Sequence, residues 1–271
     1  MNRPHAAFFK TRTSVMSSAD NQRPMAAQAT ELTDDAFLGG RVHAWQPARG
    51  FRAGLDAVML AASVLARPKE HVCDLGSGVA VASLCLAARV PNLDITAVEI
   101  DEELAALAHA NGERNRFSID VVTADILKRP RTLARQCFHH VFTNPPYHDI
   151  GRGTRAPEAV KARATSAYAH DLIAWLRFAR ALTRPKGAIT AILPPEQLQL
   201  ALQALAPEGQ GAEIFPLWPK PGAAAKRIII RTRMNARAPL QLHAGLILHT
   251  TAGKPTQEAE AVLRHGAPLF T

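Results

Sequence analysis

The motif Asn144-Pro145-Pro146-Tyr147 directly follows a short apolar run, residues 138–142. The run is typical of a buried parallel strand, and two consecutive prolines prevent regular pairing beyond it. The motif therefore lies on a stiff turn at the carboxyl end of a strand, where open α/β sheets bind ligands. An amide oxygen and a proline carbonyl provide two hydrogen-bond acceptors, and tyrosine provides a flat aromatic face. These groups suit a planar substrate that carries an NH₂ group.

The segment 71–89 is predicted to form a strand, a glycine-rich turn and a helix. Asp74 ends the strand, and the turn contains Gly76, Ser77 and Gly78. Glycine lets the backbone approach a ligand closely, and the first turn of the helix presents free N–H groups. We interpret this unit as one wall of a ligand pocket.

Residues 94–99 and 119–122 are predicted to be two further strands, and each leads to an acid. Glu99 lies about 20 residues past the glycine turn, where a carboxylate can accept both hydrogens of a ribose diol. The alternative is an acid that opens the next helix. Asp125 lies where the third strand meets the same crevice and can accept a hydrogen from a purine amino group, unless it is a solvated loop acid. Asp56 begins a helix before the glycine turn, either as a helix cap or as part of the pocket.

The remaining chain alternates helices and strands, which is typical of an α/β fold with a doubly wound, mainly parallel sheet. Residues 1–35 lack periodicity and are expected to be a disordered tail, and one domain is expected at 36–271. The acid-poor start faintly resembles a transit peptide, and Met16 or Met25 are alternative start sites. The other expected elements are a strand pair within 39–47, a binding loop at 147–165, a helix at 167–182, a strand at 187–193, a helix at 194–205, strands at 212–217, 226–232 and 240–248, and a helix at 256–265.

The composition predicts a cytoplasmic globular protein. The chain has 271 residues, 47% of them hydrophobic, which is enough for a real core. No apolar run approaches the length of about 18 residues that a membrane span requires. Cys73, Cys85 and Cys137 are odd in number and lack CxxC spacing, so we expect buried thiols in a reducing compartment. The eleven histidines are scattered, so no metal site is expected.

The positive charge is concentrated in three windows. The net charge is +9, the windows 126–136, 150–166 and 218–237 together carry +13, and the rest of the chain therefore carries −4. Concentrated basic charge favours a polyanionic partner, most simply nucleic acid. The alternative is a basic surface without a specific partner.

Four segments in chain order, DLGSG, AVEID, TAD and TNPPY, resemble the motifs of S-adenosylmethionine-dependent amino-methyltransferases. The segments AGLDAVML, ILPPEQ and AKRIIIRT, and a C-terminal helix followed by Leu269-Phe270, narrow the resemblance to the bacterial tRNA (adenine-N6)-methyltransferases. These enzymes modify the adenine beside the anticodon of a valine tRNA. The resemblance extends from about residue 37 to the end of the chain. It implies a seven-stranded Rossmann-like sheet with an additional C-terminal strand and helix, S-adenosylmethionine as the methyl donor, and RNA, in the first place tRNA, as the partner.

The resemblance also implies a role for each motif. Asp74, Gly76 and Gly78 would hold the methionine end of the cofactor, Glu99 its ribose and Asp125 its adenine amino group. The other residues implied in the cofactor pocket are Leu55, Asp56, Ser77, Ile100, Ile126 and Asn144. The family usually has a third glycine where Ala80 stands, and alanine is small enough that binding should be retained.

The catalytic residues implied are Asn144, Pro145, Pro146 and Tyr147. The Asn144 side chain and the Pro145 carbonyl would accept both hydrogens of the amine, and Tyr147 would stack on the base. The basic residues implied as RNA contacts are Arg152, Arg155, Lys161, Arg163, Lys220, Lys226 and Arg227. Each is a solvated surface charge in the alternative interpretation, whereas as a set they would make binding weaken steeply with salt.

Several other functions share parts of this pattern. Release-factor glutamine methyltransferases also use Asn-Pro-Pro-Tyr, but they carry a sizeable helical domain before the glycine turn, and only about 35 residues expected to be structured precede the turn here, which argues against them. Enzymes that methylate amines of ribosomal RNA or DNA remain alternatives. An NAD-dependent oxidoreductase would leave the Asn-Pro-Pro-Tyr motif without a purpose, and the turn is not GxGxxG. An inactive cofactor-binding scaffold is disfavoured by the intact motif.

Overall fold

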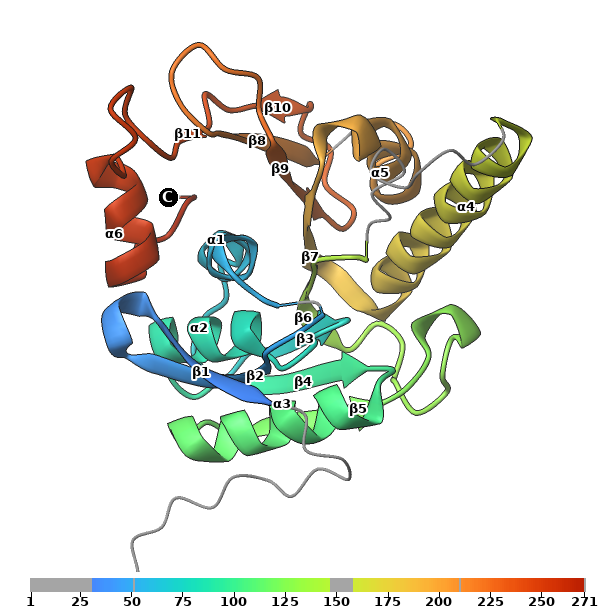
Figure 1. Ribbon diagram of the computed structural model, residues 1–271. Coiled ribbons are helices and arrows are strands. Elements are labelled where there is room, and N and C mark those ends of the chain that lie inside the picture. The colour runs from blue at the N-terminus through green and yellow to red at the C-terminus, as the bar shows by residue number, and fades with distance from the viewer. Residues whose placement is uncertain (1–30, 51, 147–157, 210, 271) are drawn as a thin grey trace, which may run out of the picture.

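One large sheet forms the centre of the computed structural model, which describes residues 31–50, 52–146, 158–209 and 211–270, with only the backbone at 158–166. Its strands are β3 (His71–Leu75), β4 (Asp94–Glu99), β5 (Ile119–Thr123), β6 (Phe138–Thr143), β7 (Thr183–Leu193), β8 (Ala212–Trp218), β9 (Arg227–Arg233), β10 (Gln241–Leu242) and β11 (Leu246–Ile247). The strand order is β10-β8-β9-β7-β6-β3-β4-β5, and β11 also pairs with β8 (Figure 1).

Strand β9 is antiparallel to both of its neighbours, β7 and β8, while the other described pairs in this sheet are parallel. The seven longer strands therefore form the mainly parallel, Rossmann-like sheet that the sequence predicts, and the predicted fold class is confirmed. The two-residue strands β10 and β11 extend it at the β8 edge.

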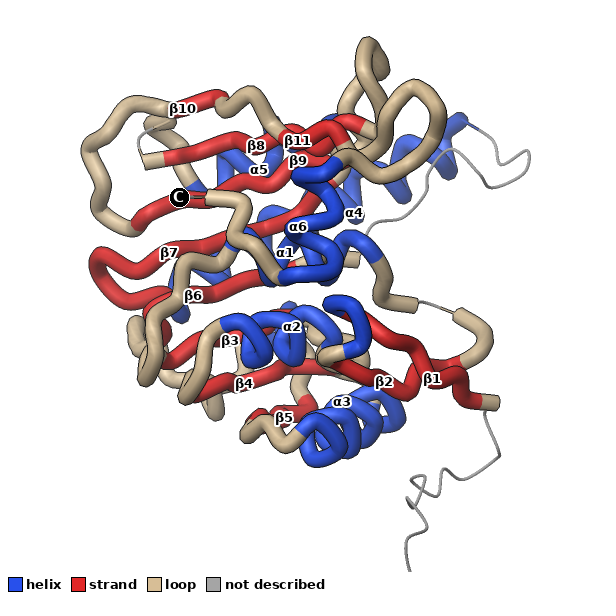
Figure 2. Tube along the Cα trace, turned by 90° about the vertical axis from the view of Figure 1, so that its left-hand side faces the viewer, coloured by secondary structure: helices blue, strands red, loops and turns tan. Residues whose placement is uncertain are grey.

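Helices cover both faces of the sheet. They are α1 (Leu55–Ser63), α2 (Val81–Arg89), α3 (Glu102–Asn115), α4 (Glu158–Leu182), α5 (Leu198–Leu205) and α6 (Gln257–His265). Figure 2 shows α1, α2, α3 and α6 on the near face of the sheet, with α4 and α5 behind it. Each face has its own apolar cluster, the first packed against α1, α2 and α6 and the second against α4 and α5. None of these helices is long and apolar enough to cross a membrane.

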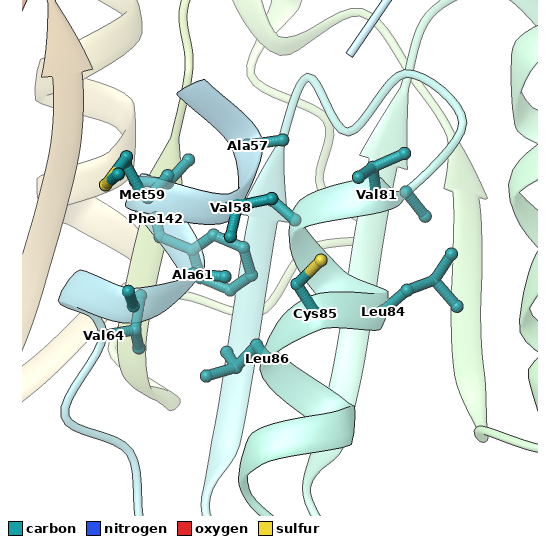
Figure 3. Packing of buried hydrophobic residues seen from close by; sticks show 14 of the residues in the cluster. Ala57, Val58, Met59, Ala61, Val64, Val81, Leu84, Cys85, Leu86 and Phe142 are labelled. Carbon is teal, nitrogen blue, oxygen red and sulfur yellow. The ribbon is translucent and has the colours of Figure 1, made fainter. Parts of the chain in front are cut away.

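Phe142, at the end of β6, is the largest fully buried side chain of the first cluster. Figure 3 shows its ring among Val58, Met59 and Ala61 of α1. Fully burying a side chain of this size contributes about 1.5–3 kcal/mol. Because Phe142 stands two residues before Asn144, this packing fixes the start of the Asn-Pro-Pro-Tyr turn relative to α1.

An N-terminal strand pair packs beside the glycine turn. It consists of β1 (Leu32–Phe37) and β2 (Val42–Pro47), joined by the short 3₁₀ turn η1 (Leu38–Gly40). The buried side chain of Asn111 on α3 accepts a hydrogen bond from Trp45 N (2.8 Å) and donates to Trp45 O and Val79 O (3.1 Å each). This one amide therefore ties the strand pair to the end of the glycine turn.

The boundaries differ from expectation at four places, and one of them is β7, which begins at Thr183 and not at Gly187. The strand pair was expected within 39–47, but its first strand lies before η1 and overlaps the end of the predicted tail; residues 1–30 lie outside the described residues. Helix α4 begins at Glu158 and not near Ala167, because alanine-rich sequence such as 159–165 propagates a helix without an apolar stripe. Residues 158–165 of the predicted binding loop are therefore helical, and its remainder, 147–157, lies outside the described residues.

The single strand expected at 240–248 is divided into β10 and β11. Gly245 lies between them with φ +84°, outside the β region, and the backbone there passes against the carbonyl of Pro216. The expectation for the thiols is met only in part, since Cys73 and Cys85 are buried and Cys137 is partly exposed.

Candidate functional site

The register of the sheet brings the predicted motifs to one edge. Leu75 lies opposite Thr143 on one side and Val98 on the other. The residues that follow these positions, Gly76 and Asn144, therefore leave adjacent strands at the same edge, where strands are about 4.8 Å apart. This is the carboxyl edge that ligands use in open α/β sheets.

The glycine turn is held by the end of β4. Gly76 N and Ser77 N donate to Val98 O at 2.8 and 3.0 Å. The Glu99 carboxylate, 7% exposed, accepts from Gly78 N at 2.8 Å and from Ile100 N and Asp101 N at 2.8 and 3.0 Å. Glu99 thus lies against the glycine turn as predicted, and Asp101 is the cap of α3. Glu99 is the last residue of β4 and lies before the first turn of α3, so the alternative interpretation, an acid that opens that helix, does not apply.

Asp74 is a buried carboxylic acid beneath the glycine turn. It is 2% exposed and accepts a hydrogen bond from the Ser83 hydroxyl at 2.7 Å. Burial, reinforced by the charge of Glu99, raises the pKa of Asp74 from 3.8 to about 7, while the Ser83 bond opposes the rise. A carboxyl group poised in this range gains most from a ligand that brings positive charge.

Thr143 joins the two motifs through a hydrogen-bond chain that the sequence did not reveal. Its buried hydroxyl donates to Leu75 O at 2.7 Å and accepts from the indole N–H of Trp175, on α4, at 2.9 Å. The same indole covers Gly76, where an added Cβ would lie 2.8 Å from the ring. These two hydrogen bonds fix the position of the last residue of β3 relative to the last residue of β6.

Two buried polar atoms at this edge have no hydrogen-bond partner among the described residues: Asn144 Oδ1 and Ser77 Oγ. Leaving a buried acceptor or hydroxyl unpaired costs about 1–3 kcal/mol. At an edge where ligands bind, a bound molecule is one source of the missing bonds. Both belong to the motifs predicted to hold the substrate and the cofactor.

Asp125 caps the short turn η2 (Ile126–Lys128) by accepting from Leu127 N at 3.0 Å, and its carboxylate lies 3.4 Å from Lys128 Nζ. It follows β5, the neighbour of β4, at the same edge. Ile126 beside it is buried and Ile100 is exposed. The acids predicted to surround the cofactor thus lie along three adjacent strand ends.

The side chains of the neighbouring residues Asp56 and Leu55 have different surroundings in the structure. Asp56 lies in the first turn of α1 and is not the cap residue, which is Gly54; its carboxylate accepts from Arg227 Nε at 2.7 Å. Because β9 starts opposite the end of β7, this ion pair stands at the carboxyl edge. Leu55 lines a cavity of about 540 Å³ against η1 and α6.

The basic residues predicted to contact RNA are only partly described. Lys220 and Lys226 are exposed in the β8–β9 connection at the carboxyl edge, and Arg227 is half-buried in its pair with Asp56. Tyr147, Arg152 and Arg155 lie outside the described residues, and Lys161 and Arg163 belong to the part of α4 whose side chains are not described.

Of the two prolines in the motif, Pro145 is buried and Pro146 is exposed. Within the described ranges, no group of three or more histidine, cysteine or acidic side chains is placed to hold a metal ion.

Comparison with known proteins relates the chain to methyltransferases. Residues 54–170 match the family model of the methyltransferase small domain. A tRNA1(Val) (adenine(37)-N6)-methyltransferase from Glaesserella parasuis is 29% identical over 182 residues, 66% of this chain and 75% of the relative. The enzyme of the same name from Serratia proteamaculans is 35% identical over 146 residues, 53% of this chain and 55% of the relative. The predicted resemblance is confirmed by these relatives.

Solved structures agree on the fold. A predicted O-methyltransferase from Agrobacterium tumefaciens superposes with a TM-score of 0.65 at 26% identity, covering 79% of this chain and 98% of that one. The 16S rRNA N2 G1207 methyltransferase of T. thermophilus, solved with S-adenosylmethionine and guanosine, superposes with a TM-score of 0.52 at 17% identity, covering 76% of this chain and 50% of that one. The glycine turn and its buried acids fit S-adenosylmethionine as the cofactor, and the matched segment together with the named relatives shows that the chain is an S-adenosylmethionine-dependent methyltransferase.

Proposed function

We propose that this methyltransferase transfers the methyl group of S-adenosylmethionine to the N6 amine of an adenine beside the anticodon of a tRNA, in the cytoplasm. The observation that carries the proposal is the buried amide oxygen of Asn144, next to the glycine turn, which has no hydrogen-bond partner within the part of the chain that the structure describes. The names of the similar enzymes support tRNA and adenine as the substrate.

The chemistry requires the amine to be made nucleophilic. The lone pair of an exocyclic adenine nitrogen is delocalised into the ring, so the nitrogen attacks poorly while it remains planar. Asn144 Oδ1 and the Pro145 carbonyl are two acceptors on consecutive residues, and together they can bond both N–H groups. Bonding both hydrogens favours a pyramidal nitrogen with its lone pair directed toward the methyl group.

S-adenosylmethionine supplies an activated methyl group, and the electron pair of the broken carbon–sulfur bond stays on sulfur. The protein has to position the amine and stabilise its developing charge. The methylated nitrogen carries an acidic surplus proton that leaves to water, so no strong general base is needed. Tyr147, which stands outside the described residues, is proposed to stack on the base.

The cofactor pocket is proposed along the ends of β3, β4 and β5. Gly76, Ser77 and Gly78 offer backbone N–H groups and the Ser77 hydroxyl, which lacks a partner among the described residues. Glu99 is proposed to accept the ribose hydroxyls, and Asp125 to accept the adenine amino group. The Asp56–Arg227 pair borders the same edge and leaves Lys220 and Lys226 exposed for RNA.

The test uses the purified protein, methyl-labelled S-adenosylmethionine and separate pools of tRNA, ribosomal RNA, DNA and release factor. We expect label in tRNA and N6-methyladenosine after nucleoside digestion. Label found only in protein, or the absence of label from every pool, would overturn the tRNA assignment. Label recovered as a 2′-O-methyl nucleoside would favour an oxygen acceptor, as the name of the Agrobacterium protein suggests, and would overturn the adenine assignment.

A matched pair of variants tests the amide itself. Asn144→Ala removes the acceptor and should lower the rate by roughly 10²–10³, in analogy with the loss of one oxyanion-hole donor. Asn144→Asp keeps an acceptor oxygen at the same place and should retain more activity than the alanine variant. Equal activity of the two variants would show that the acceptor is not used.

A further inference from the structure

Four arginines line a cavity of about 420 Å³ that the proposed methyl-transfer chemistry does not use. Arg129, Arg131 and Arg135 come from the segment between η2 and β6, and Arg177 comes from α4. Among the described residues, no carboxylate lines the cavity. Within the residues that the structure describes, none of the four guanidinium groups has an ion-pair partner. We call these four residues the arginine pocket.

The pocket is a built structure and not a set of side chains on a free loop. Its segment begins at η2, where Arg129 N donates to Ile126 O at 3.0 Å, and ends where Gln136 N donates to Ala181 O on α4 at 3.0 Å. Leu133 and Phe178, 5% and 6% exposed, form an apolar floor beneath the arginines. The backbone that carries the four arginines is therefore fixed by the fold, and their exposed side chains line one cavity.

Clustered guanidinium groups repel one another because arginine stays protonated at any physiological pH. The described residues supply no carboxylate to this cavity, so an external anion is the natural counter-charge. The planar guanidinium fork pairs with two oxygens of a phosphate at once, whereas a single carboxylate would neutralise only one arginine. A chain of phosphates satisfies several arginines together.

The pocket extends from the carboxyl edge at η2 toward the opposite edge of the sheet, where Ala181 lies just before the start of β7. Its segment leaves η2, whose cap Asp125 is proposed to bind the cofactor adenine. On α4, Arg177 follows two residues after Trp175, whose ring covers Gly76. Figure 1 shows the β5–β6 segment beside the lower end of α4, on the side toward which the arrow of β4 points. The η2 end of the pocket is the part nearest the Asn144 turn, so an RNA backbone leaving that turn meets the pocket there first.

We propose that the arginine pocket binds the phosphodiester backbone of the substrate RNA on one side of the methylated nucleotide. The identity of the RNA rests on the proposed function, but the pocket itself rests on its charge and construction. Backbone contacts position a nucleic acid without reading its sequence. The pocket would therefore act on affinity and orientation and leave the choice of base to the turn at Asn144.

The test measures RNA binding in the absence of S-adenosylmethionine. A fluorescent valine tRNA transcript and its isolated anticodon stem-loop are titrated by anisotropy between about 50 and 200 mM salt, the range over which phosphate contacts dominate affinity. The variant is Arg131→Gln/Arg135→Gln/Arg177→Gln. The control is Arg180→Gln, an exposed arginine of the same helix that does not line the cavity. A shift of melting temperature by S-adenosylmethionine confirms that each variant is folded.

The triple variant should bind tRNA at least about tenfold more weakly, and the slope of log affinity against log salt should fall by about 2–3, at roughly 0.7–0.9 per phosphate contact. Its KM for tRNA should rise while kcat at saturating RNA is retained. The control should change affinity less than about twofold. Unchanged affinity and slope in the triple variant, or an equal loss in the control, would overturn the proposal.

The outcomes separate the pocket from the proposed function. If the binding results are as expected but no adenine is methylated, the pocket stands and the adenine assignment fails. If tRNA is methylated and its KM is the same in the triple variant, the proposed function stands and the pocket fails. Free pyrophosphate is the third arm: if it binds the wild type but not the triple variant, while tRNA affinity is the same in both, the pocket holds a free phosphate compound and the assignment to an RNA backbone is overturned.

Discussion

Replacing Asp74 by Asn should make the unliganded protein more stable at neutral pH and less able to bind its cofactor. The carboxyl group is 2% exposed and has one hydrogen bond, from Ser83. Its pKa is raised from 3.8 to about 7 by burial and by the charge of Glu99. The raised pKa means that the folded state holds the proton more tightly than the unfolded state does.

The sign and size follow from this difference. Below pH 3.8 the carboxyl is protonated in both states and costs nothing. As the pH rises to about 7, only the unfolded state ionises, so the free energy of unfolding falls by about 1.4 kcal/mol per pH unit. Above pH 7 the loss is constant at about 4 kcal/mol, an order-of-magnitude figure. The amide side chain of the Asp74→Asn variant cannot ionise, so the variant lacks this loss.

The assay is urea unfolding of both proteins between pH 5 and 8. The stability advantage of Asp74→Asn should grow with pH and level off above pH 7, while contributions from other titrating groups cancel in the difference. Removing the Ser83 hydroxyl should move the levelling point to higher pH, and neutralising Glu99 should move it lower. A stability difference that does not change with pH would refute the account of Asp74.

Cofactor binding should show the opposite trend. S-adenosylmethionine carries positive charge at its sulfonium and amino groups, so it favours the ionised form of Asp74. Affinity in the wild type should therefore rise by up to about tenfold per pH unit as pH approaches 7, and Asp74→Asn should bind weakly at every pH. Calorimetric titration in matched buffers measures both trends.

Two further predictions concern the neighbourhood of the glycine turn. Thr143→Val removes both bonds of the buried hydroxyl and should cost about 2–3 kcal/mol of stability in urea unfolding, whereas Trp175→Phe keeps the bond to Leu75 and should cost about 1 kcal/mol; equal costs would refute the chain of bonds. Ala80 has φ +66°, so Ala80→Gly relieves about 1–2 kcal/mol of strain but loses about 0.8 kcal/mol of burial and about 0.5–1 kcal/mol of chain entropy. Its stability should stay within about 1 kcal/mol of the wild type with cofactor affinity retained, and a large change in either would contradict the strain argument.

The sequence predicted the sheet well because its central strands are buried on both faces. Such strands appear as short apolar runs, as in 94–99 and 138–142, and each run ends at, or two residues before, a residue that carries chemistry. The order of the motifs then placed Asp74, Glu99 and Asn144 at one edge. The structure adds distances to that arrangement and does not change it.

Contacts between distant residues could not be predicted in this way. Trp175 meets Thr143 across 32 positions and Arg227 meets Asp56 across 171, and neither pair follows a local pattern. From the sequence, Arg227 is therefore interpreted as an RNA contact or a solvated surface charge, and its ion pair with Asp56 is not predicted. The start of α4 was missed because helix propensity without amphipathic spacing gives no periodic signal. The arginine pocket was visible only as charge, because its construction depends on α4 packing against the β5–β6 segment.

Nucleoside analysis of tRNA after a single turnover with labelled S-adenosylmethionine shows which atom receives the methyl group and whether Asn144 is needed for the transfer. We expect N6-methyladenosine as the labelled nucleoside in the wild type and a rate lower by roughly 10²–10³ in Asn144→Ala at saturating cofactor. Label in any other nucleoside, or an Asn144→Ala variant as fast as the wild type, would contradict this expectation.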